Sequence, residues 1–391
     1  MTDPTQTQRL DELEIALRDA PNNLTLLGDA FDAALQAGEL ERAEKHLLQS
    51  AQLQGHDALR RWQLREAHWL IAKQRWNDAE SVLLDLLATP GIPADQRFSL
   101  AHDLAYVAMG RGDLAAGLAL LRPWVEAVPF NVNLDAAHQL LWMRLLNQSR
   151  RVDEALAWAA ARWQAKKLAP GAAGVASMMA MDAGQGTPSL VWADYALRHE
   201  SRQPEALLAR GTLALGQNDA AQSRSLLSRA LERSPNDGRV LAALGFTELH
   251  ELQFDAARSV FERATQVMPG QMGAWHGLGW TLLLQGDFSA ALQAFDSALA
   301  LNGNFAESHG GLAAALASLD RRAEAEQAVG RSLQLDPDSV AGNYAQAVLR
   351  GEGRNPQTIR DLSVRLHADQ SVGGNLLDII GRAIPLMTVN R

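Results

Sequence analysis

The chain has 391 residues, of which 47% are hydrophobic and 21% are charged, a composition typical of a globular protein and not of a disordered one. Its formal net charge is −9 and its pI is about 5.6, so neither a strongly basic face nor a nucleic-acid partner is expected. The absence of cysteine excludes disulfides, thiolate metal sites and cysteine nucleophiles.

Two further features of the composition indicate the class of protein. Only four of the 36 basic residues are lysine, which together with abundant alanine indicates a GC-rich, bacterial genome. The first residues, MTDPTQTQRL, are polar, and no stretch of about 18 apolar residues follows, so we expect neither a signal peptide nor a membrane span. The expected location is the cytoplasm.

The N-terminal half contains helical patterns of irregular length. Residues 1–23 are expected to form a capping helix and residues 24–203 five degenerate helix pairs, with Gly38 and Gly112 at turns. Eight of the ten tryptophans lie in this half: Trp62, Trp69, Trp76, Trp124, Trp142, Trp158, Trp163 and Trp192. Packing between helices is the favoured interpretation, and an exposed aromatic surface for a second partner is the alternative.

Residues 204–337 show a strict internal period. Helix-breaking residues recur at intervals of 34, at Pro235, Pro269, Gly303 and Pro337. The four units that they delimit begin at residues 204, 238, 272 and 306. Position 8 of each unit is small: Gly211, Gly245, Gly279 and Ala313. Position 24 is larger and apolar: Leu227, Phe261, Phe295 and Val329.

This pattern resembles the tetratricopeptide repeat family, in which each unit is a pair of antiparallel helices. The resemblance covers residues 24–350, is most specific in 204–337, and implies an all-α, right-handed α-solenoid (superhelix) of about nine helix pairs with helical caps. A close helix crossing explains the small residues at position 8, and Phe295 is expected to fill the gap to the next unit. Residues 338–391 are expected to form a partial unit and a C-terminal helical cap.

The string HGLGW, residues 276–280, is the stretch that most suggests a catalytic or phosphate-binding site. Gly277 and Gly279 lack the third glycine and the preceding strand of a dinucleotide site, and no P-loop, nucleophile elbow or HExxH pair occurs. The pattern places no carboxylate or third histidine beside His250 and His276 to complete a metal site. We therefore predict no catalytic residue, no cofactor and no metal.

The resemblance also implies a binding surface, because the first helix of each tetratricopeptide unit lines a concave groove. Its ligand-facing positions correspond here to seven candidate residues: Arg239, Phe246, His250, His276, Trp280, Leu284 and Tyr344. Large aromatic side chains dominate binding surfaces, so a peptide or helix is expected to dock there. For Phe246 and Trp280, packing against neighbouring helices is an equally weighted alternative.

The sequence thus predicts a non-catalytic scaffold or adaptor that holds a protein or peptide in its groove. The alternative is an accessory subunit of a multiprotein enzyme or secretion/envelope complex that docks through the N-terminal half. A third possibility, a cryptic enzyme with an inner-face histidine, requires that His276→Ala abolish turnover. The family's carboxylate clamp needs a lysine at position 5, but that position holds Leu208, Ala242, His276 and Gly310. Capture of a C-terminal carboxylate is therefore not expected, and the pattern does not set the oligomeric state.

Overall fold

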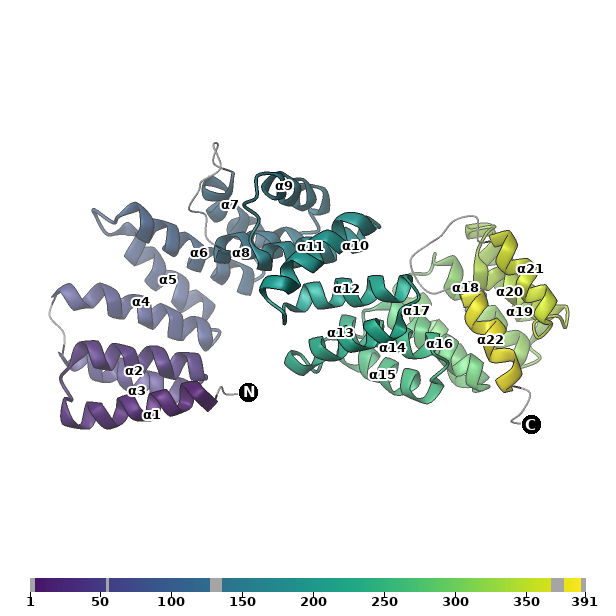
Figure 1. The fold of residues 1–391 in the computed structure, drawn as a ribbon, viewed down its shortest axis with the longest axis horizontal. Coiled ribbons are helices and arrows are strands. Elements are labelled where there is room, and N and C mark those ends of the chain that lie inside the picture. Colours follow the sequence, from purple (N-terminus) through teal and green to yellow (C-terminus); the bar gives the residue numbers. More distant parts are fainter. Residues whose placement is uncertain (1–3, 54–55, 127–135, 367–375, 388–391) are drawn as a thin grey trace. The chain divides into compact units, whose positions relative to one another are not determined.

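The computed structural model describes residues 4–53, 56–126, 136–366 and 376–387. The regular elements in those ranges are 22 α-helices, with no strand among them (Figure 1). The all-α fold predicted from the sequence is confirmed. Residues 1–3 and 388–391, at the outer ends of the two predicted caps, lie outside the described residues. Contacts divide the chain into two compact parts, Met1–Ala172 and Ala173–Arg391, called here the N-terminal and the C-terminal unit.

The N-terminal unit begins with the single helix α1 (Pro4–Asp19), which packs on α2. Four helix pairs follow: α2 (Leu24–Ala37) and α3 (Leu40–Leu53), α4 (His56–Ala72) and α5 (Trp76–Ala88), α6 (Ala94–Gly110) and α7 (Leu114–Val125), α8 (Ala136–Gln148) and α9 (Val152–Gln164). Helix α10 (Pro170–Asp182) begins in this unit and ends in the next, where α11 (Gly186–His199) follows it.

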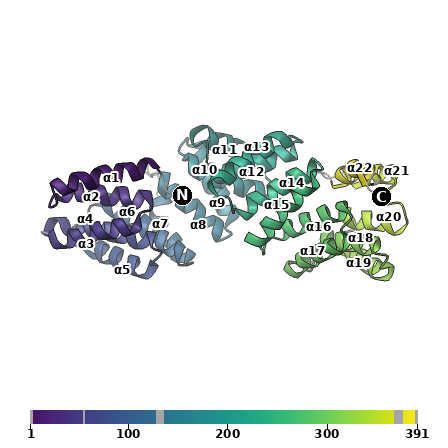
Figure 2. The ribbon, with the colours of Figure 1, turned by 90° about the horizontal axis from the view of Figure 1, so that it is seen from below.

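The C-terminal unit contains the regular repeats. Their helices are α12 (Pro204–Gly216) and α13 (Ala220–Arg233), α14 (Gly238–His250) and α15 (Phe254–Val267), α16 (Met272–Gln285) and α17 (Phe288–Leu301), α18 (Ala306–Ser318) and α19 (Arg322–Leu335). The first helix of each pair starts at the residue that the period predicts. Within this unit each helix packs on its neighbours in sequence (Figure 2). Helices α20 (Val340–Leu349), α21 (Pro356–Leu366) and α22 (Leu376–Met387) follow the last pair.

One backbone feature recurs at the turn inside every helix pair. A residue there adopts a positive φ: Gly38, Gln74, Gly112, Arg150, Gly184, Asn218, Leu252, Gly286 and Asp320. From Arg150 to Asp320 these residues are 34 apart, whereas the earlier intervals are 36 and 38 residues. Since each marks one helix pair, nine pairs follow α1 in the described residues, as predicted.

The repeats interlock through aromatic rings that lie between glycines. Phe295 on α17 packs against Gly279 of its own repeat, where a methyl group would lie 2.7 Å from the ring, and against Gly311 of the next repeat. Phe261 on α15 packs in the same way between Gly245 and Gly277. A methyl group on Gly277 or Gly311 would collide with the ring. Both glycines of HGLGW are thus explained by helix packing.

The tryptophans serve mainly as packing residues. All ten lie in the described residues, and none is among the exposed large apolar side chains. In the N-terminal core, Trp62 packs edge-to-face on Phe31, and Trp69 donates a hydrogen bond from Nε1 to the carbonyl of Leu40. Arg65 stacks over Trp62. The structure therefore gives no support to an exposed tryptophan surface for a second partner.

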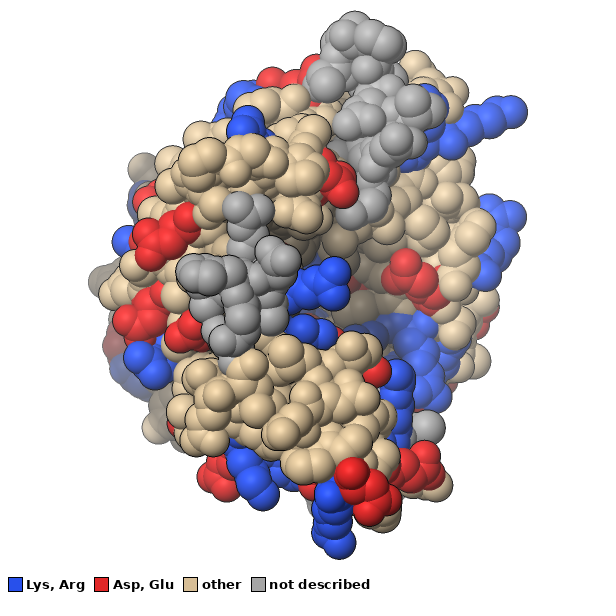
Figure 3. All heavy atoms as spheres, turned by 90° about the vertical axis from the view of Figure 1, so that its left-hand side faces the viewer, with Lys and Arg blue, Asp and Glu red and all other residues tan. Residues whose placement is uncertain are grey.

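Charges of both signs lie on the face that Figure 3 shows. Between neighbouring helices of the N-terminal unit, Arg42 pairs with Glu14 at 2.8 Å and Arg65 with Asp32 at 2.8 Å. The side-chain hydrogen bond from Arg42 lowers the pKa of Glu14. Such cross-helix pairs fix neighbouring helices more than they stabilise the fold. None of the described helices is both long and apolar enough to cross a membrane.

Candidate functional site

The first helices of the regular repeats carry the seven predicted groove residues. Helix α14 presents Arg239, Phe246 and His250, and α16 presents His276, Trp280 and Leu284, at spacings of three to seven residues that place them along one side of a helix. Tyr344 lies on α20, the helix after the last full repeat. The structure brings the residues of α16 and α20 together and leaves Arg239 apart from them.

Trp280 and Tyr344 form the centre of a buried aromatic cluster. Only 1% of the Trp280 surface and 5% of the Tyr344 surface are exposed, and their ring centroids are 5.9 Å apart. Phe295 and His276 pack edge-to-face on Trp280 at 5.7 Å and 6.2 Å. Burial raises the pKa of the Tyr344 hydroxyl to about 12. Trp280 therefore packs against neighbouring helices, as the alternative interpretation of the sequence predicted. A ligand in an open groove would not contact it.

His276 has a structural role in this cluster. Its Nε2 accepts a hydrogen bond from Trp280 Nε1 at 3.0 Å, and its Nδ1 lies 3.3 Å from Ser308 Oγ on α18. Because an indole nitrogen only donates, Nε2 must be unprotonated and Nδ1 must carry the hydrogen. Burial lowers the pKa of His276 to about 4. A neutral imidazole held on both nitrogens is unsuited to act as a base toward a substrate.

The three candidates on α14 have different surroundings. Arg239 is half-buried and pairs with Asp182 of α10 at 2.8 Å. Phe246 is half-buried and packs on Phe261 with ring centroids 5.1 Å apart. His250 is 8% exposed, and its Nδ1 has no hydrogen-bond partner among the described residues. Contact of Arg239 and Phe246 with a ligand stays a prediction.

The C-terminal helix α22 covers part of the predicted groove. It packs on α16, α20 and α21, and its buried side chains belong to the same apolar core as Trp280 and Tyr344. Burial lowers the pKa of His250 on α14, and the charge of Arg382 on α22 lowers it further. The chain's own helix thus lies over α16 and α20, where an open groove was expected, whereas the groove along α14 stays a prediction.

A cleft remains beside the covered surface. It has a volume of about 920 Å³ and lies where the turns of two repeats meet α20. Its lining includes Leu284 and Tyr344, two of the predicted residues. Around them are apolar and small residues of the turns and of α20, among them Leu252, Phe254, Leu283, Phe288 and Val348. Asp255 and the exposed Arg354 add one charge of each sign to the lining.

Leu252 in this cleft has a strained backbone. Its φ is 58°, in the left-handed region, where the equivalent positions of the adjacent repeats hold Asn218 and Gly286. Asparagine and glycine adopt this conformation easily, whereas a leucine there costs about 1–2 kcal/mol. The half-buried side chain of Leu252 packs against the apolar core at the cleft. Because the same left-handed residue recurs at the turn of every helix pair, this conformation belongs to the turn, and it places Leu252 in the lining of the cleft.

Comparison with known proteins adds the family. Tetratricopeptide repeat models match residues 208–270, 243–304 and 282–349, the stretch that contains the regular repeats and the cleft. The chain is a tetratricopeptide repeat protein. No curated protein matches it. The tetratricopeptide models start at residue 208, but the nine left-handed turns show that helix pairs extend back to α2.

Solved structures show the same fold. The Cut9–Hcn1 hetero-tetramer of APC/C is similar over 83% of this chain, with a TM-score of 0.59 and 15% identity. This chain spans 62% of the length of that one. YrrB, described as a TPR protein with an unusual peptide-binding site, is 16% identical over 58% of this chain and 98% of its own, with a TM-score of 0.36. At these identities the likeness to Cut9–Hcn1 shows the tetratricopeptide fold alone.

The N-terminal helix pairs carry a polar cluster that sequence reasoning missed. Asp103 on α6 lies 2.9 Å from His68 Nε2 on α4 and 3.1 Å from His102 Nδ1. Burial alone would raise the pKa of Asp103, but hydrogen bonds from His102 and His68 outweigh it and hold that pKa at about 2. His68 and Asp103 are 35 residues apart in irregular repeats, so no fixed period pointed to them.

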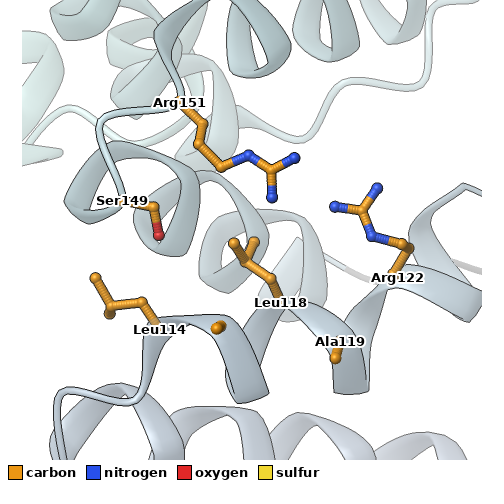
Figure 4. Close-up of a pocket in the computed structure, with 7 residues that line it drawn as sticks. Leu114, Leu118, Ala119, Arg122, Ser149 and Arg151 are labelled. Atoms are coloured by element: carbon orange, nitrogen blue, oxygen red, sulfur yellow. The ribbon is translucent and has the colours of Figure 1, made fainter.

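A second, smaller pocket lies between α7 and the turn from α8 to α9 in the N-terminal unit. Its volume is about 450 Å³, with Leu114 and Leu118 on its apolar side and the guanidinium groups of Arg122 and Arg151 facing each other across it (Figure 4). Glu154 accepts from Arg122 at 3.3 Å and from Arg151 at 2.5 Å. Arg122 also pairs with Glu126, so two carboxylates balance the two arginines, and the cleft of the C-terminal unit is the better candidate. Within the described residues, no three metal-ligating side chains are grouped to hold an ion.

Proposed function

We propose that this chain is a non-catalytic scaffold that holds a segment of a partner protein in the cleft of its C-terminal unit. The tetratricopeptide fold supports protein interaction in general. The cleft supports the finer assignment, because apolar side chains of two repeat turns and of α20 converge on it. A groove with apolar walls and few charges suits a peptide that inserts apolar side chains.

The observation that carries the proposal is the group of apolar side chains in the lining, Leu252, Phe254 and Phe288. Phe254 and Phe288 are the first residues of α15 and α17, and both are half-buried at the cleft. Aromatic residues in such positions contribute most of the binding energy of an interface. The histidines serve no catalytic step in this proposal, since His276 is held by Trp280 and Ser308.

The test uses peptides selected from a random display library on the immobilised full chain. In the variant Phe254→Ala/Phe288→Ala, the Kd of the selected peptides should rise at least about tenfold, because two aromatic anchors are lost. The matched control is Val267→Ala/Leu301→Ala, which changes exposed residues at the opposite ends of the same two helices. Circular dichroism checks that both variants keep their helices. Equal Kd values for the two variants would exclude the cleft as the site.

A further inference from the structure

We infer that the surface under α22 is a binding site for an amphipathic helix of a partner protein, and that α22 is its internal competitor. The inference rests on the proposed function, and adds to it the form of the partner and a means of regulation. It is carried by the way in which the chain's own helix packs on α16, α20 and α21.

The sequence of α22, LLDIIGRAIPLM, is amphipathic. Its buried residues are Leu377, Ile379, Ile380, Ala383 and Ile384. Leu377, Ile380 and Ile384 follow the i, i+3, i+7 spacing with which a helix lays one apolar face into a groove. On the outer face Asp378 and Arg382 are exposed and pair with each other at 2.8 Å. The surface that α22 covers, called here its seat, thus accepts a helix with one aliphatic face. A partner helix with the same spacing of apolar residues would fit this surface.

The seat contains residues that tetratricopeptide proteins direct toward ligands. Helix α22 packs on α16 and α20, which carry Trp280 and Tyr344, and shares one apolar core with them. Without a helix on this surface, the apolar faces of α16 and α20 would be exposed to water. This arrangement explains why the candidates predicted for a groove are buried.

Two features of α22 make it a replaceable occupant. Gly381 and Pro385 interrupt a helix of 12 residues, and both residue types disfavour helix formation. A partner helix without the glycine would bind better than α22, because it would form a helix more readily.

Two substitutions in the full chain change how strongly α22 binds to its seat, in opposite directions. Ile380→Glu puts a charge on the buried face of α22 and releases it from its seat. Gly381→Ala strengthens α22, because the new methyl group would meet Ile359 at 3.6 Å, an ordinary contact, while the helix propensity rises. The control Val364→Glu introduces the same charge at a residue of α21 that is 82% exposed.

The probe is a fluorescent peptide of residues 376–387, and the readout is its anisotropy with each variant. Ile380→Glu should bind the probe at least about tenfold more tightly than the unchanged chain, and Gly381→Ala about fivefold more weakly. Val364→Glu should match the unchanged chain. Equal affinity for all four proteins would overturn the inference, as would no binding to any. If Ile380→Glu fails to fold, Gly381→Ala still decides the question.

Two controls separate this inference from its alternatives. Size-exclusion chromatography reports whether two copies of the unchanged chain exchange their α22 helices and form a dimer. If they do, and if Ile380→Glu converts the dimer to a monomer, the occupant of this surface is a second copy of the chain and not a partner protein. The display-selected peptides are measured on the same variants. If they bind and depend on Phe254 and Phe288 while the α22 probe does not bind, the proposed function stands and this inference alone fails.

Discussion

His276 shows how the same residue carries different meanings in sequence and in structure. On the helix pattern it lies four residues before Trp280, where both side chains would project from one face of α16. In the structure this spacing lets Trp280 donate to His276 Nε2, and three aromatic rings enclose the imidazole: Trp280, Phe295 and Phe305. The shared face was therefore predictable, whereas its burial was not, because Phe305 and α22 belong to other parts of the chain.

The first prediction concerns the pH dependence that His276 imposes on stability. Its pKa is about 4 in the folded chain and 6.5 in a model peptide, so between these values the unfolded chain binds a proton that the folded chain does not. The stabilisation is complete above pH 6.5 and decreases as the pH falls toward 4. The loss should reach about 3 kcal/mol. Urea denaturation at pH 7 and pH 4.5 measures it.

His276→Gln is the reference for this measurement, since glutamine keeps a donor and an acceptor but does not titrate in this range. Other groups titrate alike in both proteins, so the difference between the two pH profiles isolates His276. The free energy of unfolding of the variant should fall less between pH 7 and pH 4.5. Parallel profiles would show that His276 is not held neutral.

At the scale of helices and repeats, the regular part of the fold was the most predictable. A period of 34 residues fixed the starts of α12, α14, α16 and α18, and glycine at position 8 indicated the close crossing. The N-terminal pairs were harder, because Gln74 and Arg150 replace glycine at turns whose backbone still has a positive φ. The role of Gly277 was missed, since the ring that requires it, Phe261, belongs to the preceding repeat.

The second prediction tests this interlock with Gly277→Ala. Helix propensity alone would make alanine stabilising by about 1 kcal/mol, but the new methyl group collides with Phe261. We expect a net loss of about 1–2 kcal/mol in the free energy of unfolding. The control Gly330→Ala, on α19 in open space, should be neutral or stabilising.

Adding Phe261→Leu to Gly277→Ala makes room for the methyl group. The double variant should be more stable than the sum of the two single changes predicts, by about 0.5–3 kcal/mol. Chemical denaturation of the four proteins of this cycle gives the coupling energy. A coupling energy near zero would mean that the Phe261 ring and the methyl group at position 277 do not collide.

At the scale of the whole molecule, the contacts form two units and not one continuous core. A helical repeat protein is stabilised by contacts between neighbouring repeats, so such a division allows its parts to unfold separately. The period could not predict this division, because repeat spacing does not report how well successive helices pack. Neither could it predict the place of α22, whose seat is built from α16 and α20.

The third prediction is that denaturation of the full chain is not two-state. Seven tryptophans lie before residue 172 and three after it, so fluorescence reports mainly the N-terminal unit while circular dichroism reports helices in both. The two denaturation curves should not coincide, and Gly277→Ala should shift the circular dichroism curve more than the fluorescence curve. Coincident curves that Gly277→Ala shifts equally would show a single cooperative unit.

The pairing of Phe295 with Gly311 also limits how the chain can lengthen. A repeat with phenylalanine at position 24 needs a successor with glycine at position 6, and Leu227 and Val329 precede repeats with Ala243 and Ala345 there. Residues 272–305 combine Gly277 with Phe295, so a tandem copy of this repeat would meet itself without a clash. A copy of residues 238–271 would press Phe261 against Ala243, and a copy of 306–339 would leave a void beside Gly311. Gene duplication or design that extends the array therefore has two repeats in this stretch that meet this rule, because residues 204–237 combine Ala209 with Leu227 just as residues 272–305 combine Gly277 with Phe295.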